Sequence, residues 1–488
     1  MTTDQRIEFD TLGDIKVPGD ALYGAQTARA AAWSFSGQRF PLPVIHAIAH
    51  FKAASASVRG ARGELSPDEP SPDELSPDEL SPDKARAIEQ AALEVADGQH
   101  DDHFPLEVFQ TGSATSANMN VNEVVANRAA LLLGASLPSR LVHPNDDVNA
   151  GQSSNDVVPS AVHLALLQAA GGRLRPALDR VIARFHELAD THWQDIRDGK
   201  THLMRATPLR MGQQFRGYSH QLEQHRERLT HALDGCRELP LGGTAVGTGI
   251  GCRPGLATSI CETVSSRCRT RVFETSTHLG RQGNLDAVTA FVASINTTCT
   301  TLYKLANDLR WQCTEALGEI ELPVMQPGSS IMPGKANPVV LEAVLMACQQ
   351  IEGYALVVSR ANSQGQFELH TMIPLVAINA LSAVDLLASA LDALDRHCLQ
   401  ELKVDKSASA DVGRNPILVT ALTSHIGHEQ AAELAPRAAA EGVSVLDVAR
   451  RDTDLDAATL AHLLDSSRLA GEFGSEGPAA DAVQPSDS

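Results

Sequence analysis

Apolar residues recur at helical spacing through most of the chain between residues 160 and 410, and polar residues gather in a few short stretches between them. One helix face is predicted by spacings of four, three, one, three and three residues at Leu174, Leu178, Val181, Ile182, Phe185 and Leu188. The stretches "LDAVTAFVASINTTCTTLYKLANDLRW" and "PLVAINALSAVDLLASALDAL" predict two further long helices. Helices of this length are typical of bundles, so we predict a mostly α fold with a central long-helix bundle.

The two ends of the chain have shorter patterns. "DIKVP" predicts a short strand and "YGAQTARA" the start of a helix, whereas "SVLDVARR" and "DAATLAHLLDSSRL" predict short helices after Pro416. Residues 64–83 hold four Ser-Pro-Asp units at a five-residue period. Because proline at this frequency prevents a continuous helix and the acidic charge keeps the segment solvated, we predict an exposed insertion.

These changes in pattern predict the domain organisation. We expect a mixed, mainly helical N-terminal domain (1–150) that carries the acidic insertion, the central bundle (151–410), a small helical domain (411–470) and a disordered tail (471–488).

The composition refines this picture. Aromatic residues make up only 4% of the 488 residues against 43% apolar residues, so the core consists of small aliphatic side chains that favour close helix packing. A net charge of −20 argues against nucleic acid or an anionic membrane as a partner, because both would repel such a surface. The sequence shows no membrane-spanning run of about 18 apolar residues and no apolar signal segment, so we expect a cytoplasmic protein.

The eight cysteines are scattered through the chain and form no C-x-x-C pair. This spacing predicts structural thiols and neither a metal site nor a cofactor.

Four polar stretches interrupt the helical pattern, at residues 110–123, 143–156, 200–208 and 327–340. Each one alone could be an ordinary turn or helix cap; Ser153, for example, precedes an apolar run as a capping residue would. Four such stretches bordering one bundle predict a shared pocket. A fifth segment, "LGGTAVGTG", lacks the G-K-[ST] ending of a phosphate-binding loop, so we interpret it as a tight turn between helices.

With these motifs in view, the chain resembles the fumarase/aspartase superfamily from about residue 6 to residue 450. "TGSATSANMNVNEVVANRA", "HPNDDVNAGQSSND", "THLMRATP", "LGGTAVGTG" and "GSSIMPGKANP" occur in the order of that family. The resemblance implies a three-domain fold whose central bundle forms the core of a homotetramer, with each site drawing residues from three chains. It also implies a small dicarboxylate substrate, from which fumarate is released by β-elimination.

The chemistry explains why the glycine- and serine-rich loop at 327–340 interrupts a helical region. The proton to be removed lies beside a carboxylate and is weakly acidic, so the site must stabilise a doubly deprotonated carboxylate (an aci-carboxylate) with preorganised donors. Glycines allow backbone N–H groups to approach, Lys335 adds a full charge, and a loop can open and close over the substrate. The resemblance assigns the base to Ser329, whose hydroxyl must be activated by the same donors.

The remaining roles also follow from the resemblance. His202, oriented by Glu342, is expected near the leaving group. One carboxylate is expected to bind Lys335, Asn337 and Thr201. The other carboxylate and the leaving group are expected to bind five residues with hydroxyl or amide side chains: Ser113, Thr115, Ser153, Ser154 and Asn155.

The sequence departs from the family at the leaving-group side. Family members usually carry Asp three residues after the motif histidine, whereas this chain has Arg205; Ala336 and His370 also replace the common Val and Asn. If Arg205 lies one helical turn from His202, the change is two charge units, each worth roughly 3 kcal/mol at ~5 Å and an effective dielectric of ~20. Such a cation would favour an anionic or nitro leaving group.

We therefore predict a lyase whose leading substrate is nitrosuccinate, with nitrite as leaving group, as in a natural-product branch of the family. Water, as in fumarate hydratase, and ammonia, as in aspartate ammonia-lyase, stay open as leaving groups, and so does an outward-facing Arg205. The superfamily also contains lens crystallins, so a structural protein is the non-enzyme alternative. Retention of Ser329, His202 and Lys335 favours the enzyme.

Overall fold

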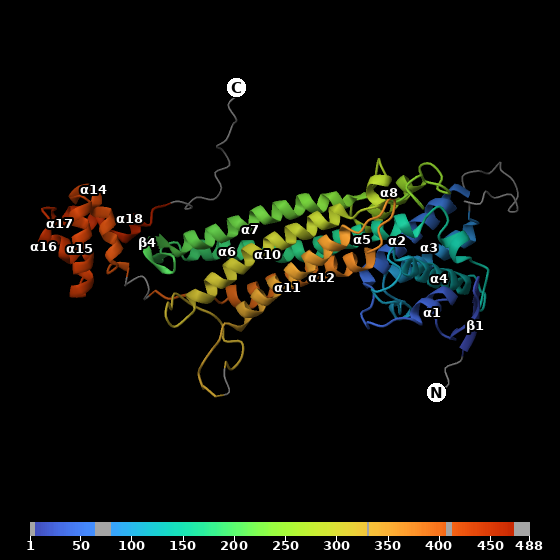
Figure 1. Cartoon of the computed structure of the whole chain (residues 1–488), viewed down its shortest axis with the longest axis horizontal. Helices are drawn as coiled ribbons and strands as arrows, with labels where there is room; N and C mark the ends of the chain where they lie inside the picture. Colours follow the sequence, from blue (N-terminus) through green and yellow to red (C-terminus); the bar gives the residue numbers. More distant parts are fainter. Residues whose placement is uncertain (1–4, 64–79, 329–330, 407–411, 473–488) are drawn as a thin grey trace, which may run out of the picture. The chain divides into compact units, whose positions relative to one another are not determined.

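The computed structural model describes residues 5–63, 80–328, 331–406 and 412–472, and these are predominantly helical (Figure 1). The helices are α1 (Ala25–Ala31), α2 (Leu42–Gly63), α3 (Pro82–Ala96), α4 (Thr115–Leu132), α5 (Ser154–Ala169), α6 (Arg175–Thr191), α7 (Met211–Asp234), α8 (Leu256–Cys268), α9 (Leu279–Gln282), α10 (Asp286–Gln312), α11 (Val339–Asn362), α12 (Ile373–Leu394), α14 (Thr423–Ile426), α15 (His428–Glu441), α16 (Val445–Asp452), α17 (Ala457–Leu463) and α18 (Ser466–Leu469). The strands pair in four two-stranded sheets: β1 (Gln5–Asp10) with β2 (Gly13–Pro18), β3 (Ile196–Thr201) with β4 (Met204–Arg210), β5 (Glu238–Leu239) with β6 (Phe273–Glu274), and β7 (Ile320–Glu321) with β8 (Lys403–Val404).

The long helices confirm the periodicity in the sequence. α6 buries Leu178, Val181 and Phe185 on one face, and α10 and α12 cover the two long apolar stretches. "DIKVP" lies in β2, and the segment after Pro416 forms short helices that share a small core around Leu422, Leu434, Val448 and Leu460. The mostly α fold is therefore confirmed.

Three predicted features lie wholly or partly outside the described residues: most of the acidic insertion (64–79), Ser329, and the tail from residue 473. The last Ser-Pro-Asp unit is described, and it begins a helix rather than preventing one. Ser81 accepts a hydrogen bond from the Lys84 backbone N–H at 3.5 Å, and Pro82 occupies the first helical position of α3. Proline suits that position because the missing N–H needs no partner there.

The chain divides into two compact units, each made of several segments. Unit 1 comprises residues 1–175, 227–297 and 349–387, and unit 2 comprises residues 176–226, 298–348 and 388–488. The predicted division into sequential domains stays a prediction.

Unit 1 is built on close contacts between helices with small side chains. α5 is buried along most of its length, and α2 packs against α3 so closely that a Cβ on Gly60 would lie 2.5 Å from the Cβ of Ala85. Such a contact is possible only with glycine, which is why an interior glycine is retained despite its cost to the helix.

Unit 2 has an aromatic core where α6 packs against α7. The Phe185 ring stacks on Phe215 with centroids 6.2 Å apart and meets the edge of Tyr218 at 5.5 Å. The Tyr218 hydroxyl donates to Asp308 on α10 at 2.8 Å. These contacts join α6, α7 and the second half of α10 into one packed group.

Two described helices are long and apolar enough to cross a membrane by length and composition, although we expected none. The segment 373–399 has a mean hydropathy of 1.7 over its best window, 61% of which is buried, whereas α11 has 1.3 and only 28%. Core helices of soluble proteins meet the same criteria, so this is weak evidence for a membrane span. The low burial of α11 does show that an apolar helix face is open in the single chain.

Candidate active site

The first turn of α4 carries two of the predicted substrate-binding hydroxyls. Ala114 precedes the helix in a left-handed conformation (φ 56°), and its N–H donates to the Thr111 carbonyl at 2.7 Å. This tight turn brings the Ser113 and Thr115 hydroxyls within 2.9 Å of each other. The two side chains therefore present adjacent hydroxyl groups at the positive end of a helix.

The first turn of α5 carries three more predicted residues. Ser153 is the N-cap, and its side-chain oxygen accepts from the Asn155 N–H at 3.2 Å. The Ser154 hydroxyl accepts from the Asn118 side-chain amide of α4 at 2.9 Å, and the Asn155 side chain donates to the Ala245 carbonyl at 2.8 Å. The predicted cap is confirmed, and Asn118 connects the first turn of α5 to α4.

Asp156 holds this region together, and the sequence analysis did not single it out. One carboxylate oxygen accepts the Ser153 N–H at 2.9 Å, and the other accepts the N–H groups of Gly242 and Thr244 at 3.0 Å each. Burial raises the pKa of Asp156, while these N–H groups act to lower it. The Ser153-x-x-Asp156 spacing of a capping box is the signal that identifies it. The contacts of Asp156 also explain the role of the segment "LGGTAVGTG". The turn predicted there wraps around the start of α5, because the Gly242 and Thr244 N–H groups donate to Asp156.

The predicted histidine lies in unit 2, at the tip of the β3–β4 hairpin. Thr201 pairs with Met204, so His202 and Leu203 form a two-residue turn, with φ of 55° and 61°. Two consecutive positive φ values are those of a type I′ turn, which favours Asn and Gly and costs other residues strain. Our assumption that Arg205 follows His202 by one helical turn was therefore wrong, because this segment is a strand pair.

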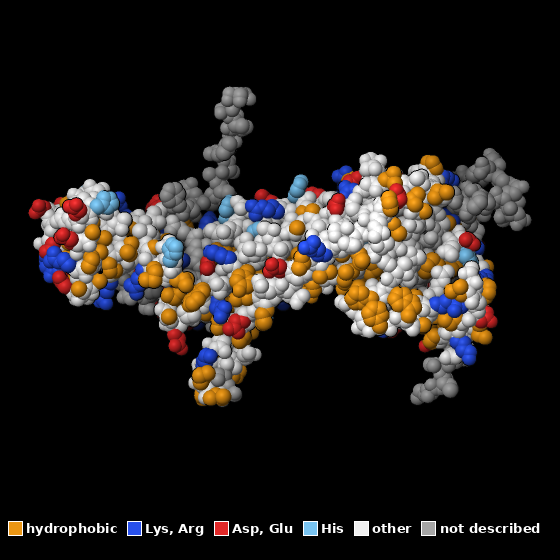
Figure 2. Space-filling model, viewed as in Figure 1, with side chains coloured by type: hydrophobic (Ala, Val, Ile, Leu, Met, Phe, Trp, Pro, Cys, Tyr) orange, Lys and Arg blue, Asp and Glu red, His pale blue; other side chains and the backbone are white. Residues whose placement is uncertain are grey.

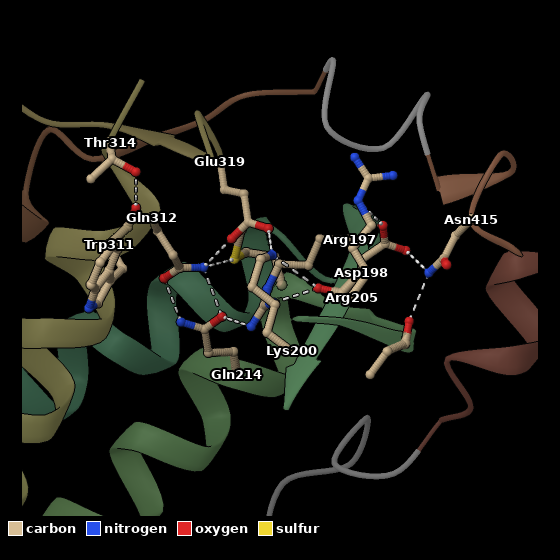
Figure 3. Close-up of polar contacts among 12 residues, drawn as sticks. Arg197, Asp198, Lys200, Arg205, Gln214, Trp311, Gln312, Thr314, Glu319 and Asn415 are labelled. Carbon is tan, nitrogen blue, oxygen red and sulfur yellow. Dashed lines mark hydrogen bonds and ion pairs between the residues drawn. The ribbon is translucent and has the colours of Figure 1, made fainter. Parts of the chain in front are cut away.

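A polar network holds the β3 strand of this hairpin (Figure 3). Lys200 forms an ion pair with Glu319, and the other Glu319 oxygen accepts from the Gln312 side chain at 3.0 Å. The Gln312 amide also contacts Gln214 of α7, at 2.7 and 3.0 Å. The hairpin is thereby attached to α7 and to the end of α10.

Arg205 faces a carboxylate of its own hairpin. Its Nε lies 3.7 Å from Asp198 Oδ2, and its side chain is 55% exposed (Figure 3). Asp198 also accepts from the Asn415 side chain at 2.7 Å, and burial raises the pKa of Asp198. Part of the positive charge that favoured nitrite is therefore balanced by Asp198.

A cleft of about 710 Å³ lies beside the hairpin within unit 2. Its lining includes His202, Lys200, Tyr218, Asp308 and Trp311. The His202 side chain is thus exposed to solvent next to this cleft rather than packed in a core.

The two ends of the glycine- and serine-rich loop at 327–340, which we call the signature loop, lie close together. The Asn337 side chain donates to the Gly328 carbonyl at 3.1 Å, and a Cβ on Gly328 would lie 2.0 Å from the Lys335 carbonyl oxygen. Only glycine permits this approach, which brings the two ends of the loop together. Lys335 is exposed, and so is Glu342 in the first turn of α11.

The predicted residues thus form two groups. Five lie at the first turns of α4 and α5 in unit 1, and the described others lie on the hairpin, the signature loop and the first turn of α11 in unit 2. Between the described residues of this chain, no hydrogen bond or ion pair joins His202 to Glu342. His370, noted as a departure, is a buried structural residue: its ring contacts the Asn362 carbonyl at 3.3 Å and accepts the Met372 N–H at 3.2 Å.

The cysteines and acidic side chains do not form a metal centre in the described part of the chain. No group of three or more His, Cys, Asp or Glu residues there is placed to hold an ion. All eight cysteines are free thiols, and five are buried.

Comparison with protein families covers most of the chain. Residues 13–353 match the family described as lyase, and residues 418–471 match the family described as the C-terminus of fumarase C.

Individual relatives match over almost their full length. Class II fumarate hydratases of Xylella fastidiosa and Thermosynechococcus vestitus are 41% and 40% identical, covering 95% and 92% of this chain and 95% and 94% of their own. Among solved structures, a class II fumarase from Schistosoma mansoni superposes with a TM-score of 0.89 at 32% identity, over 96% of this chain and 100% of its own. A fumarate lyase:delta crystallin from Brucella melitensis superposes with the same score at 36% identity and the same coverage.

Proposed function

This chain belongs to the fumarase/aspartase superfamily of lyases, and on that premise we propose that it catalyses the reversible addition of water to fumarate. The observation that carries the proposal is the identity of about 40%, over more than nine-tenths of both chains, to proteins named class II fumarate hydratase. It favours water over our leading expectation, nitrite, which the names of these relatives do not support. The pairing of Arg205 with Asp198 also weakens the charge argument for nitrite.

We propose that the first turns of α4 and α5 bind one carboxylate of the substrate. Ser113, Thr115, Ser154 and Asn155 supply hydroxyl and amide groups there, and Ser153 caps the helix whose N–H groups face the ligand. A helix N-terminus favours a carboxylate because its free N–H groups and dipole are positive. None of these four side chains carries a charge, so the helix dipoles supply positive potential to the subsite.

We propose that the second group binds the other carboxylate and performs the proton transfers. Lys335, Asn337 and Thr201 bind the carboxylate that becomes doubly charged when a proton leaves the adjacent carbon. Ser329 removes that proton in malate dehydration and returns it in fumarate hydration. His202, oriented by Glu342, activates or protonates the water oxygen.

The exposure of the second group supports a homotetramer in which each site takes residues from three chains. His202, Lys335 and Glu342 are exposed in the single chain, although their proposed chemistry needs a site that is closed to bulk solvent and holds only the reacting water. α11 also leaves Met346 and Leu356 67% and 59% exposed, and apolar side chains are visible on this surface of the molecule (Figure 2). If other copies of the chain pack against this helix face, they bury its apolar side chains and also close the site to solvent. The cytoplasmic location expected from the sequence stays a prediction.

The test is to incubate the purified protein separately with fumarate, malate, aspartate and nitrosuccinate and to follow fumarate absorbance. We expect rapid interconversion of fumarate and malate and little turnover of aspartate, because the relatives of about 40% identity are named fumarate hydratases. Turnover of nitrosuccinate much faster than that of malate would contradict the proposal and favour nitrite elimination.

A further inference from the structure

Two buried cations lie on one face of α2 and point towards the stretch 143–156. Lys52 is fully buried, with 0% exposure, and Arg59 is 2% exposed. They are seven residues apart and so lie on the same side of the helix. The Arg59 guanidinium donates to the Asp147 carbonyl at 2.6 Å. Both cations therefore donate hydrogen bonds to the segment that leads into the first turn of α5.

The surroundings of Lys52 are unusual for a buried charge. Its ammonium donates to Asn149 Oδ1 and to Gln152 Oε1, each at 2.7 Å, and both are neutral carboxamide oxygens. A buried ammonium without a directly bonded carboxylate is costly, and a polar but neutral side chain would avoid that cost. We therefore looked for a function of the positive charge of Lys52.

A chain of hydrogen bonds leads from this ammonium to a proposed substrate-binding hydroxyl. Asn149 Oδ1, which accepts from Lys52, also accepts from the Asn118 side-chain amide at 3.2 Å. The same Asn118 nitrogen donates its other hydrogen to Ser154 Oγ at 2.9 Å. An amide NH₂ group has two hydrogens and a carboxamide oxygen has two lone pairs, so both atoms are fully used. The chain leaves the hydrogen of the Ser154 hydroxyl to be donated to a ligand.

We propose that Lys52 is a positioning residue for the carboxylate subsite: its ammonium fixes Asn149 and, through Asn118, aims the Ser154 hydroxyl at the substrate. Its buried charge also adds positive potential behind a subsite that has no cationic side chain of its own. The inference rests on the proposed function only in that the first turn of α5 binds a carboxylate.

Other charged groups near Lys52 determine how it responds to pH. Asp156 on α5 attracts its ammonium and Arg59 on α2 repels it, while Asp147 in the connecting segment is paired with Lys84. Burial lowers the pKa of Lys52 to about 7. A dianion bound at the first turn of α5 favours the protonated form, so binding above pH 7 should be accompanied by proton uptake.

The experiment compares wild type with Lys52→Met and Asn118→Leu, which remove the charge and break the chain with side chains of similar size. The control is Lys84→Met, because Lys84 pairs with Asp147 in the same segment at 3.1 Å but does not contact the chain. Three quantities are measured: KM and kcat for malate, the inhibition constant of succinate, and proton uptake on succinate binding at pH 8 by calorimetry in two buffers.

We expect both test variants to raise KM and the succinate inhibition constant about tenfold or more, the effect of losing a hydrogen bond that depends on a charged group. kcat should change less, the control should stay within about twofold, and Lys52→Met should lose the proton uptake of the wild type. If Lys52→Met fails to fold, the inference is tested by the succinate affinity of Asn118→Leu and by the number of protons that the wild type takes up on binding succinate.

Unchanged succinate affinity in Asn118→Leu, or absence of proton uptake by the wild type, overturns the inference. A wild-type protein that binds succinate with proton uptake but does not hydrate fumarate would contradict the proposed function and leave the inference standing. If the wild type hydrates fumarate but both variants bind succinate normally, the proposed function stands and the inference about Lys52 is overturned.

Discussion

The two groups of proposed site residues differ in how completely this chain builds them. The first turns of α4 and α5 are held within unit 1 by Asp156, Asn118 and Lys52, all of them buried. The hairpin tip and the signature loop in unit 2 are exposed, and the tip has two non-glycine residues at positive φ. The first group is preorganised by its own chain, whereas the second is in contact with solvent on the side where its chemistry would occur.

This difference has a physical reason. Binding a carboxylate requires fixed donors, and fixing them before the ligand arrives lowers the cost of binding. Proton transfer requires a dry site that must also admit a dianion, so its residues belong on segments that can close. We therefore expect substitutions in the first group to change folding and binding together, and those in the second to change turnover without affecting stability.

The largest effect is expected for Ser329→Ala, because loss of the proposed base removes the proton-transfer step. kcat for malate should fall by a factor of about a thousand or more, with KM changed far less. Steady-state kinetics measure this, and size-exclusion chromatography serves as the control for assembly. An active Ser329→Ala protein would mean that the base is another residue.

Asp156→Asn should have the largest effect on stability. The new side-chain NH₂ group would face N–H donors that now share a carboxylate, so buried donors would lose their acceptor at a cost of about 2–4 kcal/mol. Chemical denaturation should show this loss together with a raised KM. The matched control is Asp146→Asn in the same stretch, since the Asp146 side chain is 81% exposed; it should behave as wild type. Equal effects in the two variants would contradict our account of α5.

Arg205→Ala is expected to have a smaller effect. The Arg205–Asp198 pair is more than half exposed on the arginine side, and such pairs contribute about 0–1 kcal/mol. Hydration of fumarate should change by less than about threefold in kcat/KM. A loss of a hundredfold or more would show that Arg205 touches the substrate in the assembled enzyme and would reopen the case for an anionic leaving group.

Leu203→Gly should have the smallest effect on the fold. Leu203 adopts φ of 61° and is 66% exposed, so glycine relieves backbone strain while little packing is lost. The free energy of unfolding should rise or fall by no more than about 1 kcal/mol. Thermal unfolding measures it. A marked destabilisation would show that Leu203 is buried against another copy, which would sharpen the contrast between the two groups.

Much of the fold could be predicted from local patterns. Long helices such as α10 and α12 follow from apolar periodicity alone, and the cap at Ser153 follows from a serine before an apolar run. The hairpin at His202 could not be predicted in this way. Its turn has neither Asn-Gly nor any glycine, so the usual sequence signal for a two-residue loop is missing.

The roles of the buried polar residues could not be predicted from the sequence either. Asn118 and Asp156 lie inside motifs that were recognised, but nothing in their spacing shows that one connects α4 to α5 and the other wraps a distant loop around α5. Lys52 lies between Phe51 and Ala53 in a helical segment, and its neighbours in sequence do not indicate its partners. Such contacts join residues about 30 to 100 positions apart, and periodicity carries no information at that range.

By itself, then, the sequence determined the helical architecture, the family motifs and the reaction class, because these depend on local pattern and on residue types held in a fixed order. Only the tertiary structure decided that Arg205 sits on a hairpin against Asp198, and that a buried ammonium stands behind the first turn of α5. The reason is that charge acts through space: the same arginine or lysine has a different effect according to which carboxylate or carboxamide the fold brings within a few ångströms.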